Sequence, residues 1–177
     1  KPVYKEKLRL RSYGRADREH PVFMELKKKY RSIVYKRRLT LPYGRALDCL
    51  TGDCPWPETQ IGREIGYAMD FYPDLEPRVF LSYERDSWYA PESGLRITFD
   101  DAIRFRTADL TLDSDLWGTA LLRPDQVLME LKAPGAIPLW MVRLLTEMGL
   151  YKTSFSKYGT AYQILLEQEY KGGKRYA

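Results

Sequence analysis

Charged and apolar residues alternate near the start of the chain, in Lys7-Leu-Arg-Leu-Arg11. Successive side chains of a β-strand point to opposite faces of its sheet, so Lys7, Arg9 and Arg11 would share one face and the leucines the other. In a single strand this pattern is typical of an outer, solvated face. The same pattern returns in several later segments, and that repetition constrains the fold more than any other feature.

Five or more segments carry charge on one side and apolar groups on the other. Those that follow the first are Glu25, Lys27 and Lys29; Val34, Lys36 and Arg38; Tyr83 and Arg85; Arg96, Arg104 and Arg106, if no bulge intervenes; and Glu130 with Lys132. If the sheet curves into a barrel with these faces inward, the interior is a cationic channel that requires an anionic occupant. The opposite orientation gives a small barrel with an apolar interior, and the pattern does not choose between the two.

The predicted elements make an α+β chain. Periodicity and turn residues predict strands over Lys7–Tyr13, Val22–Tyr30, Ser32–Leu39, Arg78–Trp88, Gly94–Arg106 (bent or interrupted near Asp100-Asp101) and Gln126–Lys132. Helices are predicted over Leu41–Leu50, Glu58–Phe71 and Pro138–Met148. The first three strands are expected to form an antiparallel meander, and the helices to cap or flank the sheet.

Composition is consistent with one compact domain and an anionic partner. The chain has 177 residues and a net charge of +5, enough length for a core and a balance that favours anions. No apolar run approaches the ~18 residues of a membrane span and no signal-peptide pattern is present, so no membrane segment and a cytoplasmic location are expected. Cys49 and Cys54 lie far in sequence from the single His20, so a structural zinc site lacks ligands. Reduced structural thiols are expected rather than a disulfide.

Two further segments carry candidate chemistry. Glu130 lies in an otherwise apolar strand, where a carboxylate either pairs with a basic neighbour or holds a divalent ion; the sequence favours the ion pair, and Glu25 has the same ambiguity. In Ser154–Gly159, Ser156 and Lys157 can reach a phosphate, although a helix-capping serine with a surface lysine is the simpler interpretation.

Several segments together resemble the VTC polyphosphate polymerase domain, one of the triphosphate tunnel metalloenzymes of the CYTH-like superfamily. They are Lys7-Leu-Arg-Leu-Arg-Ser-Tyr-Gly14, Met24-Glu-Leu-Lys27, Ile33-Val-Tyr-Lys-Arg-Arg38, Leu81-Ser-Tyr-Glu-Arg85, Leu95-Arg-Ile-Thr-Phe-Asp100, Leu128-Met-Glu-Leu-Lys132 and Ser154-Phe-Ser-Lys-Tyr158. Their order and approximate spacing agree from Lys7 to about Tyr158.

The resemblance implies an antiparallel β-barrel, the triphosphate tunnel, whose basic lining holds ATP and a growing polyphosphate chain. By motif, the expected catalytic residues are Lys27, Arg85 and Lys157. The expected substrate-binding residues are Arg9, Arg11, Lys36, Tyr83, Arg96, Lys132 and Ser156. Glu130 is expected to bind the metal, Mn²⁺ or Mg²⁺. The implied reaction transfers the γ-phosphoryl group of ATP to the end of the chain.

The resemblance also sets expectations about extent and about competing functions. A single domain is expected over residues 1–170, with a flexible tail over 171–177. Family members normally begin with further strands, so the resemblance implies either a trimmed or partly recorded domain or a tunnel with an open wall. Two alternatives stay open: a metal-dependent triphosphatase on the same scaffold, and a non-catalytic module that binds polyphosphate or another polyanion. No specific nucleic acid is expected, because RRM, KH and OB signatures are missing, and the sequence carries no signal of oligomeric state.

Overall fold

The computed structural model describes residues 3–173. They divide into two compact units. The first holds the chain up to Pro77 together with Thr111–Asp115, and the second holds Arg78–Leu110 and the chain from Leu116 onward. Each unit is described below by itself.

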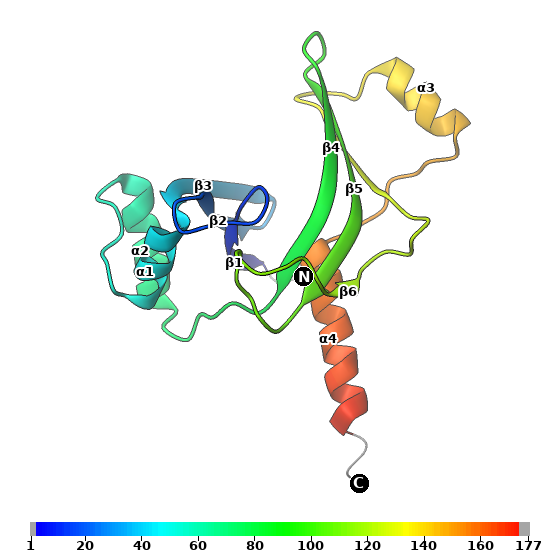
Figure 1. Cartoon of the computed structure of the whole chain (residues 1–177). Helices are drawn as coiled ribbons and strands as arrows, with labels where there is room; N and C mark the ends of the chain where they lie inside the picture. Colours follow the sequence, from blue (N-terminus) through cyan, green and yellow to red (C-terminus); the bar gives the residue numbers. More distant parts are fainter. Residues whose placement is uncertain (1–2, 174–177) are drawn as a thin grey trace. The chain divides into compact units, whose positions relative to one another are not determined.

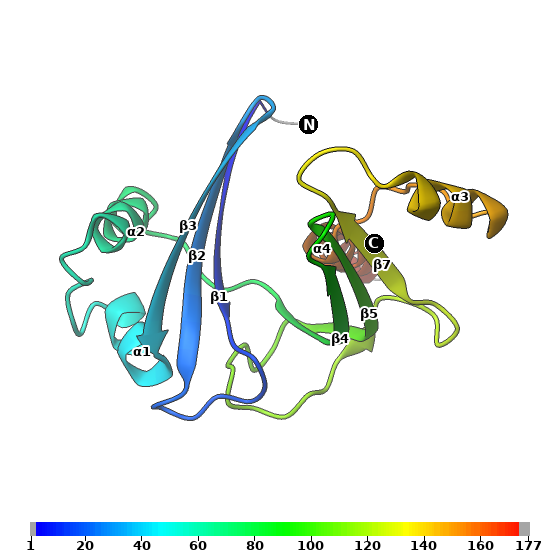
Figure 2. The same ribbon diagram turned by 90° about the horizontal axis from the view of Figure 1, so that it is seen from above.

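The first unit is an antiparallel sheet with two helices. Its strands are β1 (Tyr4–Arg11), β2 (Pro21–Tyr30) and β3 (Ile33–Pro42), in the order β1-β2-β3. The helices α1 (Tyr43–Thr51) and α2 (Gln60–Phe71) lie on one side of this sheet (Figure 2). The predicted meander and both flanking helices are confirmed, with ends shifted by up to three residues.

Apolar side chains hold the helices against the sheet. Met24 and Leu26 of β2 pack with Ile65 and Ala68 of α2 in a buried cluster, and Leu8 of β1 lies against it. A second cluster joins β2 and β3 to α1. The apolar face predicted from the alternation is therefore the face that α1 and α2 cover, and burying it supplies the main stabilisation of this unit.

Local signals explain where the helices begin and end. The side chain of Thr59 accepts a hydrogen bond from the backbone N–H of Gly62 at 3.0 Å, which caps the start of α2. Helix α1 ends at Gly52, whose φ of 86° places it in the left-handed region where glycine is favoured. The two prolines at 55 and 57 then separate the helices.

The second unit contains a long hairpin with two short strands and two helices. Strands β4 (Phe80–Ala90) and β5 (Leu95–Arg106) form the hairpin visible in Figure 1. Both β6 (Thr119–Ala120) and β7 (Leu128–Lys132) pair antiparallel with β5. Helices α3 (Leu139–Glu147) and α4 (Lys157–Gly173) follow. The sequence predicted the two strands of the hairpin, β7 and α3, but neither β6 nor α4 as such.

A bulge in β5 divides this strand into two halves. Ser82 is opposite Arg104 and Glu84 is opposite Asp101, so β5 carries one extra residue. Ala102 has a φ of 44° there. Because a bulge reverses the side-chain alternation, Arg104 and Arg106 face the opposite side of the sheet from Arg96. Arg96, Arg104 and Arg106 were predicted to share one face only in the absence of a bulge, so they do not share it. The predicted interruption near Asp100-Asp101 is confirmed.

The predicted fold class is confirmed as α+β with antiparallel sheets. Closure of the strands into one barrel stays a prediction, as does the division into one domain and a tail. Helix α4 reaches Gly173, and the tail residues 174–177 lie outside the described residues. Over the described part of the chain, no helix combines the length and apolar content needed to cross a bilayer.

Candidate functional site

The face of the first sheet that points away from α1 and α2 is strongly basic. By the strand register it carries eight cationic side chains, called here the basic face: Lys5, Lys7, Arg9, Arg11, Lys27, Lys29, Lys36 and Arg38. Lys27 is central, because it lies opposite Lys7 on β1 and Lys36 on β3. This arrangement brings together the four site residues that the sequence predicted in this unit, Arg9, Arg11, Lys27 and Lys36.

One buried carboxylate organises the basic face. Glu25 on β2 is only 2% exposed. It accepts hydrogen bonds from Arg9 and from Arg38, the latter at 2.7 Å, and Lys36 approaches it at 3.0 Å. The Nη2 atom of Arg11 lies 3.9 Å away. Of the two interpretations that the sequence left open for Glu25, the structure has the ion pair.

Glu25 should make the stability of the protein sensitive to acid. Burial alone raises the pKa of Glu25, but hydrogen bonds from Arg9, Lys36 and Arg38 outweigh it and lower the pKa to about 2, from 4.5. Since the folded state binds the proton less readily, the stabilisation is complete above about pH 4.5 and is lost as the pH falls toward 2. We expect Glu25→Gln to remove this dependence and to cost on the order of 3 kcal/mol of unfolding free energy at pH 7.

Urea unfolding between pH 2 and pH 7 measures this effect. The exposed Glu58, also in the first unit, offers a matched control: Glu58→Gln should change the unfolding free energy by less than about 0.5 kcal/mol. Equal acid sensitivity of wild type and Glu25→Gln would contradict the assignment.

The cations of the basic face crowd one another. The pKa of the Lys7 ammonium is lowered to about 8. Burial is the largest cause, and the charges of Arg9, Lys27 and Lys5 add to it. In addition, the Nε atom of Arg11 is buried and has no hydrogen-bond partner among the described residues. Both observations indicate a surface on which an anion would be favourable.

The second unit has its own charged cluster, defined as Tyr83, Arg85, Asp100, Glu130 and Lys157. Asp100 lies opposite Arg85, and its neighbour on the same face, Thr98, lies opposite Glu130. Asp100 is fully buried and bonds to both Arg85 and Lys157. The ring of Tyr83 lies 5.0 Å from the guanidinium of Arg85 and 4.6 Å from the ammonium of Lys157. Four predicted site residues therefore converge on Asp100 or lie beside it.

The remaining predicted residues of this unit lie at the margin of the cluster. Arg96 on β5 is opposite Lys132 on β7, on the same face as Asp100 but four residues away along the strand. Ser156 accepts a hydrogen bond from the N–H of Gly159 at 3.2 Å, so it caps α4. The capping role that the sequence offered as the simpler alternative is thus present, and it places Lys157 at the first position of the helix.

Glu130 can contribute a single carboxylate to a divalent ion. Its Oε1 lies 2.7 Å from Nζ of Lys132, and this hydrogen bond is the largest cause of its lowered pKa. Within the described residues, no three His, Cys, Asp or Glu side chains gather where they could hold a metal ion. A site made of protein ligands alone does not fit. An ion that takes one carboxylate and otherwise phosphate oxygens and water does fit, which is how Mg²⁺ is commonly bound with phosphates.

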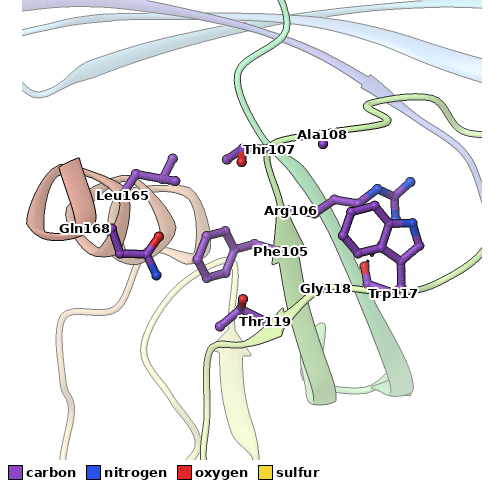
Figure 3. A pocket seen from close by; sticks show the side chains of 9 residues that line it. All are labelled: Phe105, Arg106, Thr107, Ala108, Trp117, Gly118, Thr119, Leu165 and Gln168. Carbon is purple, nitrogen blue, oxygen red and sulfur yellow. Dashed lines mark hydrogen bonds between the residues drawn. The ribbon is translucent and has the colours of Figure 1, made fainter. Parts of the chain in front are cut away.

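A cavity of about 350 Å³ lies at the end of β5 beyond the bulge, and none of its lining residues belongs to the charged cluster; Figure 3 shows these lining residues. Among the described residues that line it, Arg106 alone is charged, and it is 3% exposed. Its guanidinium stacks on Phe80 at 3.6 Å and donates to the carbonyls of Asp109 and Trp117. Through these contacts Arg106 holds the loop that follows β5 in place.

Two residues of these clusters were absent from the predicted site. The sequence places Arg38 on the charged face but predicts no site role for it. Asp100 was quoted only within its segment, although an acid two positions beyond Thr98 on a cationic face is a signal for an internal partner. Each forms an ion pair with a residue of a neighbouring strand: Arg38 with Glu25, and Asp100 with Arg85.

The chain matches a known protein family. The model of a family described as the VTC domain covers residues 1–166. No curated protein matches the chain.

Proposed function

The chain belongs to the VTC domain family, and from this premise we propose that it is a polyphosphate polymerase that uses ATP. An oxygen of the terminal phosphate of a polyphosphate chain attacks the γ-phosphorus of ATP. The bond from that phosphorus to the β,γ-bridging oxygen breaks, the chain grows by one phosphate, and ADP leaves. The antiparallel β-barrel with a basic tunnel is part of the same proposal.

The basic face of the first unit is the observation that carries the proposal. Its apolar counterpart is covered by α1 and α2, so the apolar residues of β1–β3 are not available to fill a barrel. The cations lie on the face away from these helices, and four of them lie close to the carboxylate of Glu25: Arg9, Arg11, Lys36 and Arg38. A linear polyanion supplies the missing negative charge, because Arg binds phosphate oxygens with paired donors and Lys adds a mobile charge.

The charged cluster of the second unit suits phosphoryl transfer. Such transfer depends mainly on positioning and on stabilising the charge of the transferred group, and needs no protein nucleophile. In the proposal, Lys27, Arg85 and Lys157 stabilise this charge, while Arg9, Arg11, Lys36, Tyr83, Arg96, Lys132 and Ser156 bind substrate phosphates. A divalent ion, Mn²⁺ or Mg²⁺, on Glu130 would neutralise phosphate oxygens.

Incubation of the purified protein with ATP and Mn²⁺ tests the function. Polymer length measured on gels, together with ³¹P NMR, separates the possible products. A long acid-labile polymer with an equivalent amount of ADP is expected. Free phosphate without polymer would overturn polymerisation in favour of the triphosphatase. Binding of polyphosphate without any turnover of ATP would overturn catalysis and favour the non-catalytic polyanion-binding module.

A further inference from the structure

The carboxylate of Asp100 joins two elements that are remote in sequence. It is 0% exposed, on β5. Its Oδ1 accepts a hydrogen bond from Nε of Arg85 on β4, and its Oδ2 accepts one from Nη2 of the same residue at 2.7 Å. Oδ2 also accepts a hydrogen bond from the ammonium of Lys157, 57 residues further along the chain. Both oxygens are therefore used by the two cations.

This pairing fixes the orientation of both cations. Two of the five N–H donors of Arg85 point at Asp100, and three remain for another partner. One of the three donors of Lys157 is used in the same way. The ring of Tyr83 lies beside both charged groups. Neither side chain can turn without breaking a hydrogen bond to a buried carboxylate.

Because Asp100 is buried, breaking its hydrogen bonds with Arg85 and Lys157 is energetically unfavourable. Burial raises the pKa of Asp100, but the hydrogen bonds from Arg85 and Lys157 outweigh it, so the pKa lies below its usual value and the group is ionised. An ionised carboxylate left without partners in the interior is strongly unfavourable. The same hydrogen bond raises the pKa of Arg85. The three groups therefore act as one unit.

The backbone places Asp100 where this contact is possible. Asp100 is the last residue of β5 on this face before the bulge at Ala102. Bulges are common where a strand re-aims a side chain beside a site. Ser156 caps α4 and sets Lys157 at its first residue. The bulge in β5 and the cap of α4 thus position Asp100 and Lys157, which are remote in sequence, for their hydrogen bond.

We propose that Asp100 is a positioning residue that holds Arg85 and Lys157 with their remaining N–H donors directed at a phosphate group. The identity of the ligand in this proposal rests on the proposed function, since phosphate is the group that those donors would bind. Its structural part, the restraint of Lys157 by Asp100, is measurable in the protein without substrate.

Labelling of Lys157 tests the restraint. The protein is treated briefly with acetic anhydride at pH 7.5, and the modification of Lys157 is quantified by mass spectrometry. Asp100→Asn should raise the rate of modification about tenfold, because a hydrogen bond to a charged group is lost. The neighbouring Asp101 lies on the opposite face of β5 and is exposed, so Asp101→Asn should leave the rate unchanged.

Equal labelling in wild type and a folded Asp100→Asn variant would overturn the proposal. So would an equal increase in Asp101→Asn. Because labelling requires no turnover, a wild-type protein that makes no polymer would reject the proposed function and leave this result standing.

Kinetics add a second, separate measurement. Asp100→Asn is expected to lower kcat for polymer formation about 100-fold with little change in KM for ATP, since the cations remain present but lose their orientation. If that variant does not fold, Asp100→Glu keeps the charge and displaces both cations by one methylene. A loss of about tenfold in kcat is expected for the folded Glu variant. Wild-type kcat in a folded Glu variant would overturn the proposal.

Discussion

Replacement of Lys27 and Lys36 by alanine is expected to weaken the binding of polyphosphate about 100-fold. The two residues are directly opposite each other on β2 and β3, in the middle of the basic face. A hydrogen bond to a charged group contributes roughly 1.5–3 kcal/mol, so two lost contacts reach this size. The slope of the logarithm of affinity against the logarithm of salt should also decrease by about two, one for each contact removed.

The same strands offer a matched control. Lys28 and Arg37 lie on the side that α1 and α2 cover, where Lys28 pairs with Glu6 and Arg37 with Glu64. Lys28→Ala with Arg37→Ala removes the same charge from the other face. We expect its affinity to stay within about threefold of wild type, as for general electrostatics alone. Fluorescence titration with a labelled polyphosphate of fixed length measures both. An equal loss in the two double variants would show that only net charge matters.

The first sheet was predictable because its alternation is regular and local. A period of two over β1, β2 and β3, with short turns between them, fixes both the pairing and the two faces. The choice between a charged and an apolar interior was not predictable, because it depends on what covers the apolar face. Packing of Ile65 and Ala68 against Met24 and Leu26 shows which face of this sheet the helices cover.

The bulge shows what local patterns leave out. Arg96, Arg104 and Arg106 are separated by even numbers of residues, so the period of two alone assigns them to one face. One extra residue at Ala102, an alanine with a positive φ, reverses the second half of the strand. Alanine carries no turn signal. The role of Arg106 as an internal anchor for the loop after β5 follows from this reversal.

The other parts of the candidate site that the sequence did not predict depend on contacts between residues that are remote in the chain. Helix α4 brings Lys157 to Asp100 across 57 residues, and no local pattern predicts which carboxylate a remote lysine will meet. Resemblance to family motifs named Arg85 and Lys157 but not their shared partner. The same holds for Arg38, whose importance is visible only once Glu25 is found buried between β1 and β3. In the first unit the missed residue, Arg38, is a partner of a buried carboxylate, and in the second unit the missed residue, Asp100, is the buried carboxylate itself.

Glu130→Gln is expected to lower the Mn²⁺-dependent turnover of ATP at least 100-fold and to leave the affinity for polyphosphate within about threefold of wild type. The carboxylate is the group on this face that a divalent ion can share with phosphates, since both oxygens of Asp100 are used by Arg85 and Lys157. A lost metal ligand removes charge stabilisation of the transferred phosphoryl group, an effect of about 10²–10³ in rate. Polyphosphate binding relies on cations and should not need Glu130.

The ion pair between Glu130 and Lys132 supplies the competing explanation, and a metal titration separates the two. If Glu130 binds the ion, Glu130→Gln shifts the Mn²⁺ concentration for half-maximal activity upward, whereas Lys132→Ala changes KM for ATP and leaves that concentration unchanged. If the pair at 2.7 Å is purely structural, both variants lose activity and thermal stability together. Glu84→Gln, on the opposite face of β4 beside Asp101, should behave as wild type. A folded Glu130→Gln protein with normal Mn²⁺ dependence would contradict the metal assignment, because Asp100, the other carboxylate on this face of the described strands, is already used by Arg85 and Lys157.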